Sequence, residues 1–192
     1  MTIGRTVLLL ALLGLAACAT TPEYPAPSST AEARQTEVAQ PASPASALHV
    51  NDAGLKLIKE SEGLHLHAYV DTGQWLIGYG HAEGAHPGAW ITAARAEQLL
   101  HADLAICEHA VAGSLTRQAT PNQFSAMVSL CYNIGAQRFA ASTMVRRFND
   151  GNVEGAADAF LDWTKGTVNG TKVVLPRLED RRRKERVLFM AT

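Results

Sequence analysis

Glu62 and Asp71 are the two residues of this 192-residue chain whose types and surroundings could do chemistry together. Glu62 is followed by the apolar Leu64 and Leu66, and such neighbours favour the neutral carboxyl that a general acid needs. Asp71 stands in the polar sequence 71–73 and should stay ionised. Two carboxyl groups in unlike environments are the equipment of glycoside hydrolysis. Taken alone, the pattern is weak, because acidic pairs nine residues apart are common and are usually two solvated surface acids.

A helix and a hairpin are predicted to position these carboxylates. Asn51 or Asp52 can cap a helix with apolar residues at helical spacing, and Gly63 can end it just after the first carboxylate. Residues 64–81 alternate between apolar and polar types on both sides of an Asp-Thr-Gly turn. This alternation predicts a β-hairpin, with the second carboxylate at its turn.

The rest of the chain has mostly helical signals. Thr92 can cap a long helix, and residues 120–123 combine a cap, a proline at the first helical position and a following glutamine. That second helix should end near Gly135. Further helices are predicted to begin at Ser142, Asn152 and Pro176. One small hairpin near the start of an otherwise helical domain predicts a helix-rich α+β fold over residues 50–192.

The N-terminus is predicted to lie outside this fold. Residues 1–17 combine Arg5, a short apolar stretch and small residues, which is typical of a secretory signal peptide. Leu15-Ala16-Ala17-Cys18 resembles the bacterial lipobox, in which cleavage precedes a cysteine that is then acylated. Lipid on Cys18 would anchor the exported protein to the bacterial membrane. The resemblance to Gram-negative lipoproteins implies that Ala19, in place of Asp, favours the outer membrane, facing the periplasm. An ordinary signal peptide with a cysteine by chance is the alternative.

Residues 18–49 are predicted to be a disordered tether that follows the lipidated cysteine. They contain five of the eight prolines of the chain, together with many Ala, Ser and Thr residues. Such a sequence has too few large apolar residues to offset the entropy lost on ordering. An irregular segment packed on the domain is the alternative.

Composition and spacing argue against several other functions. The chain has 17 Lys and Arg, 18 Asp and Glu and a net charge of −1, so it lacks the basic surplus of a nucleic-acid-binding protein. The basic run 181–186 is interleaved with acids and predicts a solvated helix face. His65 and His67 share a strand face without a third ligand nearby, so we expect no metal site.

Two cysteines remain once Cys18 is assigned to lipid. Cys107 and Cys131 both fall on apolar helical stripes, and we predict buried thiols. A disulfide in an oxidising periplasm is the alternative, which the separation of their Cα atoms would decide.

The run from Glu62 to His81, EGLHLHAYVDTGQWLIGYGH, resembles the active-site segment of phage-type lysozymes, the endolysin and muramidase group of glycoside hydrolases. Residues 91–105, 122–135, 141–151 and 175–189 resemble later segments of the same family in order, so the resemblance covers residues 52–190. It implies a lysozyme-like domain with a small N-terminal β-hairpin and a helical C-terminal lobe. It also implies cleavage of the β-1,4 bond between N-acetylmuramic acid and N-acetylglucosamine in peptidoglycan. We expect a monomer that needs no cofactor.

The resemblance also implies roles for single residues. Glu62 matches the proton donor to the glycosidic oxygen, and Asp71 matches the carboxylate that supports charge on the sugar or activates water. The residues that match substrate-binding positions are Gly78, Tyr79, Gly80, Tyr132 and Ser142. The residues that match supporting positions are His81 and Asp103, an ion pair that we expect to serve stability, and Arg182, which could hold Glu62.

The chain departs from the family pattern at two positions. Leu76 stands where relatives have a threonine that helps to place the attacking water, and Arg177 stands where they usually have glycine after Pro176. Three hypotheses follow from Leu76. Thr72 or Gln74 places the water instead; the sugar's own hydroxyl closes on the anomeric carbon, as in a lytic transglycosylase; or the domain binds peptidoglycan without turnover.

Overall fold

The computed structural model describes residues 48–71, 73–168 and 170–191. The predicted signal peptide, Cys18 and nearly all of the predicted tether lie outside the described residues. None of the described helices is both long and apolar enough to cross a membrane. The description therefore concerns the domain that was predicted to carry the chemistry.

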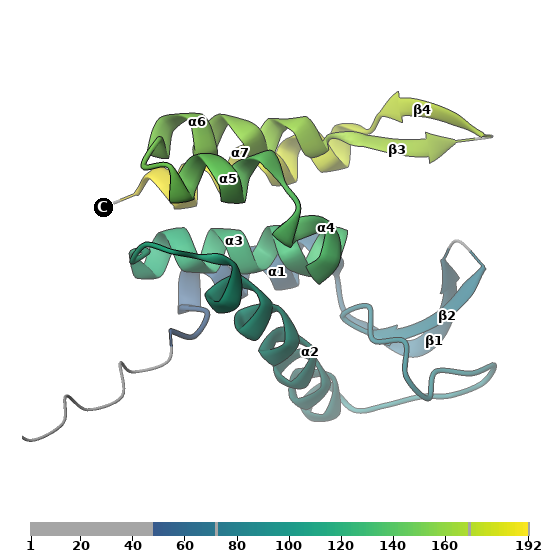
Figure 1. Ribbon diagram of the computed structural model, residues 1–192. Coiled ribbons are helices and arrows are strands. Elements are labelled where there is room, and N and C mark those ends of the chain that lie inside the picture. Colours follow the sequence, from purple (N-terminus) through teal and green to yellow (C-terminus); the bar gives the residue numbers. More distant parts are fainter. Residues whose placement is uncertain (1–47, 72, 169, 192) are drawn as a thin grey trace, which may run out of the picture. The chain divides into compact units, whose positions relative to one another are not determined.

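The described residues form helices and two separate hairpins (Figure 1). In chain order the elements are α1 (Asp52–Glu62), β1 (His65–Asp71), β2 (Gln74–Gly78), α2 (Ala93–Ser114), α3 (Pro121–Ile134), α4 (Ala136–Ala140), α5 (Thr143–Asn149), α6 (Val153–Asp158), the 3-10 helix η1 (Ala159–Trp163), β3 (Lys165–Val168), β4 (Thr171–Val174) and α7 (Pro176–Met190). The predicted helix-rich α+β class is confirmed. The hairpin of β3 and β4, α4 and η1 were not predicted.

Local capping signals fix where the helices begin. The side chain of Asn51, rather than Asp52, caps α1 by accepting a hydrogen bond from the Gly54 N–H at 2.9 Å. Thr120 and Gln123 form a reciprocal capping box at the start of α3. Gly63 ends α1 with φ at 73°, a conformation that glycine adopts without strain. The chain therefore turns from α1 into β1 directly after Glu62.

The first hairpin is antiparallel and is extended by a third segment. Tyr69 pairs with Leu76 and Asp71 pairs with Gln74 across the two strands. The backbone of residues 89–91 adds to the other edge of β1, because the Ala68 N–H donates to the Ala89 carbonyl at 2.9 Å. Asp71 is thereby fixed in register at the end of β1.

The hydrophobic core surrounds α3. Every residue of α3 from Phe124 to Cys131 is buried, and α3 contacts α1, α2 and α7. In the last third of the chain, Phe189 packs edge to face against Phe148 and in a tilted arrangement against Phe160. Helix α3 is therefore the scaffold against which the surrounding elements are placed.

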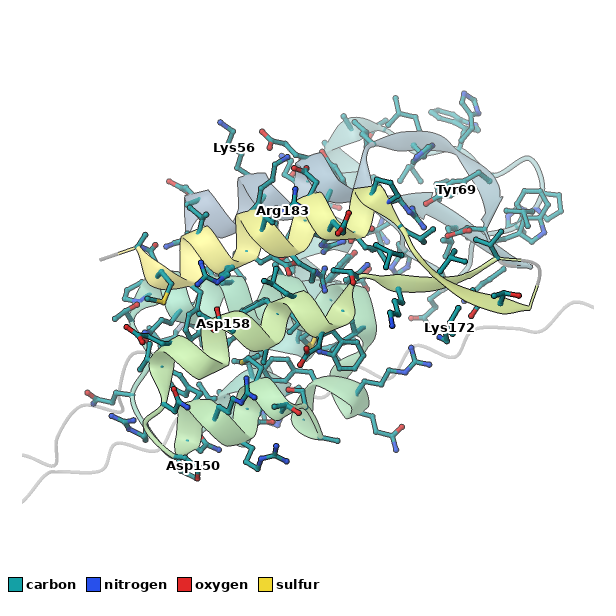
Figure 2. All side chains as sticks on the ribbon, turned by 90° about the horizontal axis from the view of Figure 1, so that it is seen from above. Lys56, Tyr69, Asp150, Asp158, Lys172 and Arg183 are labelled. Carbon is teal, nitrogen blue, oxygen red and sulfur yellow. A yellow bond between two sulfur atoms is a disulfide. The ribbon has the colours of Figure 1, made fainter. Side chains whose placement is uncertain are left out.

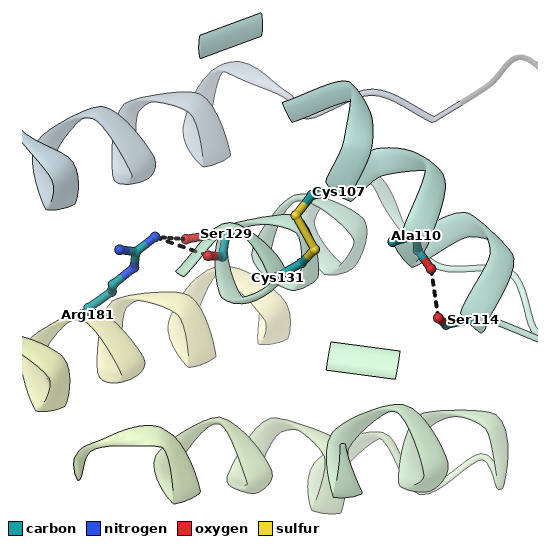
Figure 3. The surroundings of a disulfide bond; sticks show 6 residues. All are labelled: Cys107, Ala110, Ser114, Ser129, Cys131 and Arg181. Atoms are coloured by element: carbon teal, nitrogen blue, oxygen red, sulfur yellow. Dashed lines mark hydrogen bonds between the residues drawn. A yellow bond between two sulfur atoms is a disulfide. The ribbon is translucent and has the colours of Figure 1, made fainter. Parts of the chain in front are cut away.

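A disulfide joins Cys107 of α2 to Cys131 of α3 (Figure 3). Their Cα atoms lie 5.8 Å apart, within the range that a disulfide spans. Both residues are buried, as their apolar surroundings indicated. The prediction of free thiols is wrong, because two separate apolar stripes meet where α2 crosses α3.

Candidate active site

A cleft of about 860 Å³ contains both predicted carboxylates. Its walls come from the end of α1, the first hairpin, the turn after β2, α2, the end of α3 and the start of α7. A second groove of about 630 Å³ contains neither Glu62 nor Asp71. It shares four lining residues with this cleft: His81, Glu83, Asp103 and Ile106. The larger cleft is therefore the candidate active site.

Glu62 is the last residue of α1, and its side chain is 21% exposed. Its Oε1 accepts a hydrogen bond of 2.6 Å from Nη1 of Arg181. Its Oε2 faces Gly80, where a Cβ atom would lie only 3.8 Å away. Gly80 lines the cleft, so one carboxyl oxygen is held by a cation while the other borders the space that a substrate would fill.

The apolar shield expected around Glu62 is absent. Leu64 and Leu66 are 43% and 39% exposed, so they do not remove Glu62 from water. Leu64 lies between α1 and β1 and Leu66 lies in β1, and both side chains are exposed to solvent. The environment of Glu62 is set instead by the guanidinium of Arg181.

Arg181, and not Arg182, holds Glu62. Nε of Arg181 donates to Oε1 of Glu185 at 3.0 Å. Its Nη2 donates to the carbonyl of Ser129 at 3.1 Å (Figure 3). Glu185 is fully buried and also accepts a hydrogen bond of 2.7 Å from the Ser129 hydroxyl. Arg181 is thus clamped between α3 and its own helix, with one nitrogen left for Glu62.

Arg182 shares the partner Glu185 with Arg181 but otherwise points to the end of α3 and not to Glu62. Its Nε lies 2.9 Å from Oε2 of Glu185, and its Nη2 donates to Oδ1 of Asn133 at 3.1 Å. A step of one residue rotates a side chain by about 100° around a helix. Because of that rotation, only one of the two neighbouring arginines reaches Glu62, and their shared residue type could not show which one.

The charged groups beside Glu62 shift one another's pKa values. Burial by itself would lower the pKa of Arg181, but Glu62 and Glu185 raise it above its ordinary value. Burial lowers the pKa of Arg182 to about 10, against the opposing effect of Glu185. Burial raises the pKa of Glu185, and the two guanidinium groups oppose that rise. Glu62 therefore faces a permanent cation.

Asp71 lies in a contrasting environment at the tip of the first hairpin. It is exposed, as its polar turn indicated, and it lines the cleft. Leu76, on the partner strand opposite Tyr69, also lines the cleft. Of the two residues suggested as substitutes for the family threonine, Thr72 lies outside the described residues and Gln74 is exposed without lining the cleft. An apolar side chain therefore occupies this part of the wall.

His81 and Asp103, which were predicted to pair, are in contact. Nδ1 of His81 lies 2.8 Å from Oδ2 of Asp103, and both residues line the cleft. Asp103 comes from α2, one turn before Cys107 of the disulfide. The pair therefore ties the turn after β2 to the helix that the disulfide fastens to α3.

The glycine-rich strand contributes less to the cleft than predicted. Gly80 lines it, with φ at 96°, but Gly78 and Tyr79 do not. Gly78 packs against Ala96 of α2, and a Cβ there would lie 3.4 Å from the Ala96 Cβ. Gly78 is therefore a packing position.

Tyr79 turns away from the cleft into a polar cluster. Its hydroxyl donates to Oε1 of Glu97 at 2.9 Å, and Nζ of Lys59 lies 2.6 Å from the same oxygen. The carbonyl of Tyr79 accepts a hydrogen bond of 3.0 Å from the hydroxyl of Tyr132. Tyr132 does line the cleft, as predicted, and it positions the backbone before Gly80.

Ser142 does not line the cleft. It is buried, and its hydroxyl caps α5 by accepting a hydrogen bond from the Val145 N–H at 3.2 Å. A serine hydroxyl can either cap a helix or bind a sugar, and that of Ser142 caps a helix.

Several cleft residues were missed or undervalued by the sequence analysis. Those that line the cleft include His65, Tyr69, Glu83, Asn133 and Arg177. Arg177 was noted for its departure from the family pattern, and that departure was the signal that could have identified it. Among the described residues, no group of three His, Cys, Asp or Glu side chains is arranged to hold a metal ion.

Known proteins are similar to this chain in both sequence and fold. The family described as phage lysozyme matches residues 59–185. An endolysin of Acyrthosiphon pisum secondary endosymbiont phage 1 is 39% identical over 143 residues, which cover 74% of this chain and 98% of the relative. The endolysin of Salmonella phage P22 is 37% identical over 150 residues, covering 75% and 99%.

Two solved structures are similar over the same region. The muramidase domain of SpmX from Asticaccaulis excentricus superposes with a TM-score of 0.71 at 42% identity, covering 75% of this chain and 99% of that one. An endolysin from Escherichia coli O157:H7 phage FAHEc1 superposes with a TM-score of 0.70 at 41% identity, covering 74% and 93%.

Proposed function

We propose that this chain, which belongs to the phage lysozyme family and is a peptidoglycan-lytic enzyme, is a muramidase. It would hydrolyse the β-1,4 bond between N-acetylmuramic acid and N-acetylglucosamine. The observation that carries the proposal is the cleft that contains Glu62, held by a buried arginine, together with the exposed Asp71. Two carboxyl groups in unlike environments suit the acid and the charge-stabilising role in glycoside cleavage.

In this mechanism Glu62 acts on the glycosidic oxygen, and Asp71 acts at the anomeric carbon. Oε2 of Glu62, on the side of Gly80, would carry the proton that passes to the glycosidic oxygen as the bond from that oxygen to the anomeric carbon breaks. Asp71 would stabilise the positive charge left on the sugar and accept a proton from the water that adds to the anomeric carbon. Arg181 would orient Glu62 through Oε1.

A lytic transglycosylase is the second candidate, and Leu76 favours it. Leu76 lines the cleft where relatives carry a threonine that places water, and a leucine side chain cannot hydrogen-bond to water. The muramic acid residue's own hydroxyl would then add to the anomeric carbon, with its proton leaving to Asp71, and would give an anhydro product.

Mass spectrometry of peptidoglycan digests distinguishes these mechanisms. Reducing-end muropeptides are expected from a hydrolase, and anhydro ends from a transglycosylase. Glu62→Gln is the matched control, and Leu76→Thr should increase the share of reducing ends. A folded protein that gives no products, yet binds the wall equally well as Glu62→Gln, would contradict both mechanisms in favour of a binding protein.

We also propose that Cys18 is lipidated and anchors the enzyme to the outer membrane, facing the periplasm. The support is the lipobox-like sequence 15–18. Cys18→Ser should release the protein from membrane fractions, whereas Ala19→Asp should retain it in the inner membrane. A fully membrane-bound Cys18→Ser protein would contradict the proposal.

A further inference from the structure

Acidic side chains outnumber lysine and arginine in the candidate cleft, although the proposed substrate is itself anionic. Four carboxylates line it: Glu62, Asp71, Glu83 and Asp103. Among the described residues that line it, Arg177 alone is a lysine or an arginine. A carboxylate on an incoming glycan strand would be repelled by the acidic side chains of this wall that remain ionised. Arg177 is the side chain that could offset the repulsion.

Arg177 also differs from the other basic residues of its helix. Those residues each lie within 4.0 Å of an acidic side chain: Arg181, Arg182, Arg183, Lys184 and Arg186. Arg177 has no ion-pair partner and no side-chain hydrogen bond in the part of the chain that the structure describes, and it is exposed. Its guanidinium is therefore available to a ligand.

The position of Arg177 brings this charge close to the reacting groups. As the second residue of α7, it lines the main cleft and also a small adjoining pocket of about 170 Å³ that contains Glu62 and Arg181. Burial, Glu62 and Asp71 raise the pKa of the cleft-lining Tyr69, and the nearby charge of Arg177 opposes that rise. A group bound by Arg177 would thus lie beside the carboxylate that is proposed to protonate the bond.

We propose that Arg177 is a specificity-determining residue that binds a carboxylate of the peptidoglycan strand in the cleft. The inference rests on the proposed function and names the part of the substrate that the cleft recognises. The carboxylate would come either from the peptide attached to muramic acid or, where the peptide has been removed, from the lactyl group of muramic acid. A guanidinium is suited to either, because its paired N–H groups match the two carboxylate oxygens.

The test compares full-length Arg177→Ala with the wild type on three forms of peptidoglycan. The first carries its peptides, the second has its peptides removed by an amidase, and the third has its carboxylates converted to amides. On the first form, the KM of Arg177→Ala should rise about tenfold with kcat little changed, since a charge-assisted hydrogen bond is lost. On the amidated form the two proteins should be equal. A rise on the second form as well would identify the lactyl carboxylate as a sufficient ligand.

Two further variants make the interpretation specific. Arg177→Lys keeps the charge but loses the paired N–H groups, so it should restore only part of the affinity. Arg183→Ala is the matched control, because Arg183 is on the same helix (Figure 2). Its side chain is 71% exposed, and it does not line the cleft. An equal rise in KM for Arg177→Ala on the amidated form, or an equal effect of Arg183→Ala, would overturn the proposal.

Binding measurements separate this proposal from the proposed function. Glu62→Gln and Glu62→Gln/Arg177→Ala are compared for co-sedimentation with untreated and amidated peptidoglycan. Weaker binding of the double variant to untreated material alone supports carboxylate recognition, even if the wild type gives no cleavage products and the proposed function fails. Equal binding of both variants to untreated material overturns the role of Arg177, whatever the activity.

Discussion

The two carboxylates of the cleft are supported in opposite ways. Glu62 ends a helix and is bound by Arg181, which is itself fixed by Ser129 and by the buried Glu185. Asp71 stands exposed at the end of a strand and is positioned by the backbone pairing of a two-stranded hairpin. The contrast suits a reaction in which one group must deliver a proton to a defined atom and the other must respond to a diffuse charge.

Removal of the proton donor should have the largest effect. Glu62→Gln should lower the rate of peptidoglycan lysis by about 10³-fold, because general acid catalysis is lost. The amide oxygen can still accept a hydrogen bond from Arg181, so thermal unfolding should change little. A lysis rate near that of the wild type would assign the acid role to another residue.

Loss of the support beneath Glu62 should be detected as a loss of stability. Arg181→Met should reduce the free energy of unfolding by about 3–4 kcal/mol, because it leaves buried carboxylates with fewer cations. Urea denaturation measures this value. Arg183→Ala, which breaks only an exposed contact with Glu179, should change it by less than about 0.5 kcal/mol. Similar values for the two variants would contradict the proposed clamp.

The disulfide supports the same side of the cleft from α2 and α3. Its two cysteines are 24 residues apart in sequence, and a loop of that size predicts about 3 kcal/mol of stabilisation. Reduction or the Cys107→Ala/Cys131→Ala variant should lower the urea midpoint accordingly. A midpoint that is insensitive to reductant would show that packing between the two helices is sufficient.

A shift of each carboxylate by one methylene group compares the two supports directly. Glu62→Asp should lose about 10²-fold in lysis rate, because its carboxyl group leaves the position set by Arg181. Asp71→Glu should lose only about tenfold, because the exposed hairpin tip can adjust. Steady-state rates with both variants give the comparison, and equal losses would mean that both sites are equally rigid.

The smallest effect is expected at Glu97, which links α2 to Lys59 and Tyr79. The hydrogen bond from Lys59 holds the pKa of Glu97 below its ordinary value of 4.5. Because the folded-state pKa is depressed, the contribution is present above pH 4.5 and is lost as the pH falls through the folded-state value. Glu97→Gln should therefore destabilise the protein by no more than about 1 kcal/mol near neutral pH, since the pair is partly exposed. In acid the difference from the wild type should disappear, as urea titrations at several pH values would reveal.

Local signals predicted most of the helices and the first hairpin. The Asn51 cap and the Thr120 capping box depend on residues within one helical turn, so the sequence contains the whole interaction. The hairpin of β3 and β4 was missed because nearly all of its described side chains are exposed, which leaves no alternation to recognise.

The site was harder to predict where the answer depended on tertiary contacts. Arg181 and Arg182 have the same residue type, and only the orientation of α7 relative to α1 decides which one reaches Glu62. The pairing of Cys107 with Cys131 likewise depends on how α2 crosses α3. Ser142 was assigned to the cleft by family resemblance, although its position before a helix already allowed a capping role.

The disulfide also changes what a break in the peptide backbone would mean. Residues 115–120 connect α2 to α3, and they lie between the two cysteines in sequence. Cleavage there would put Glu62 on one fragment and Arg181 on the other. The fragments would remain one covalent molecule through the cross-link, so the acid and the guanidinium that orients it would not be free to diffuse apart.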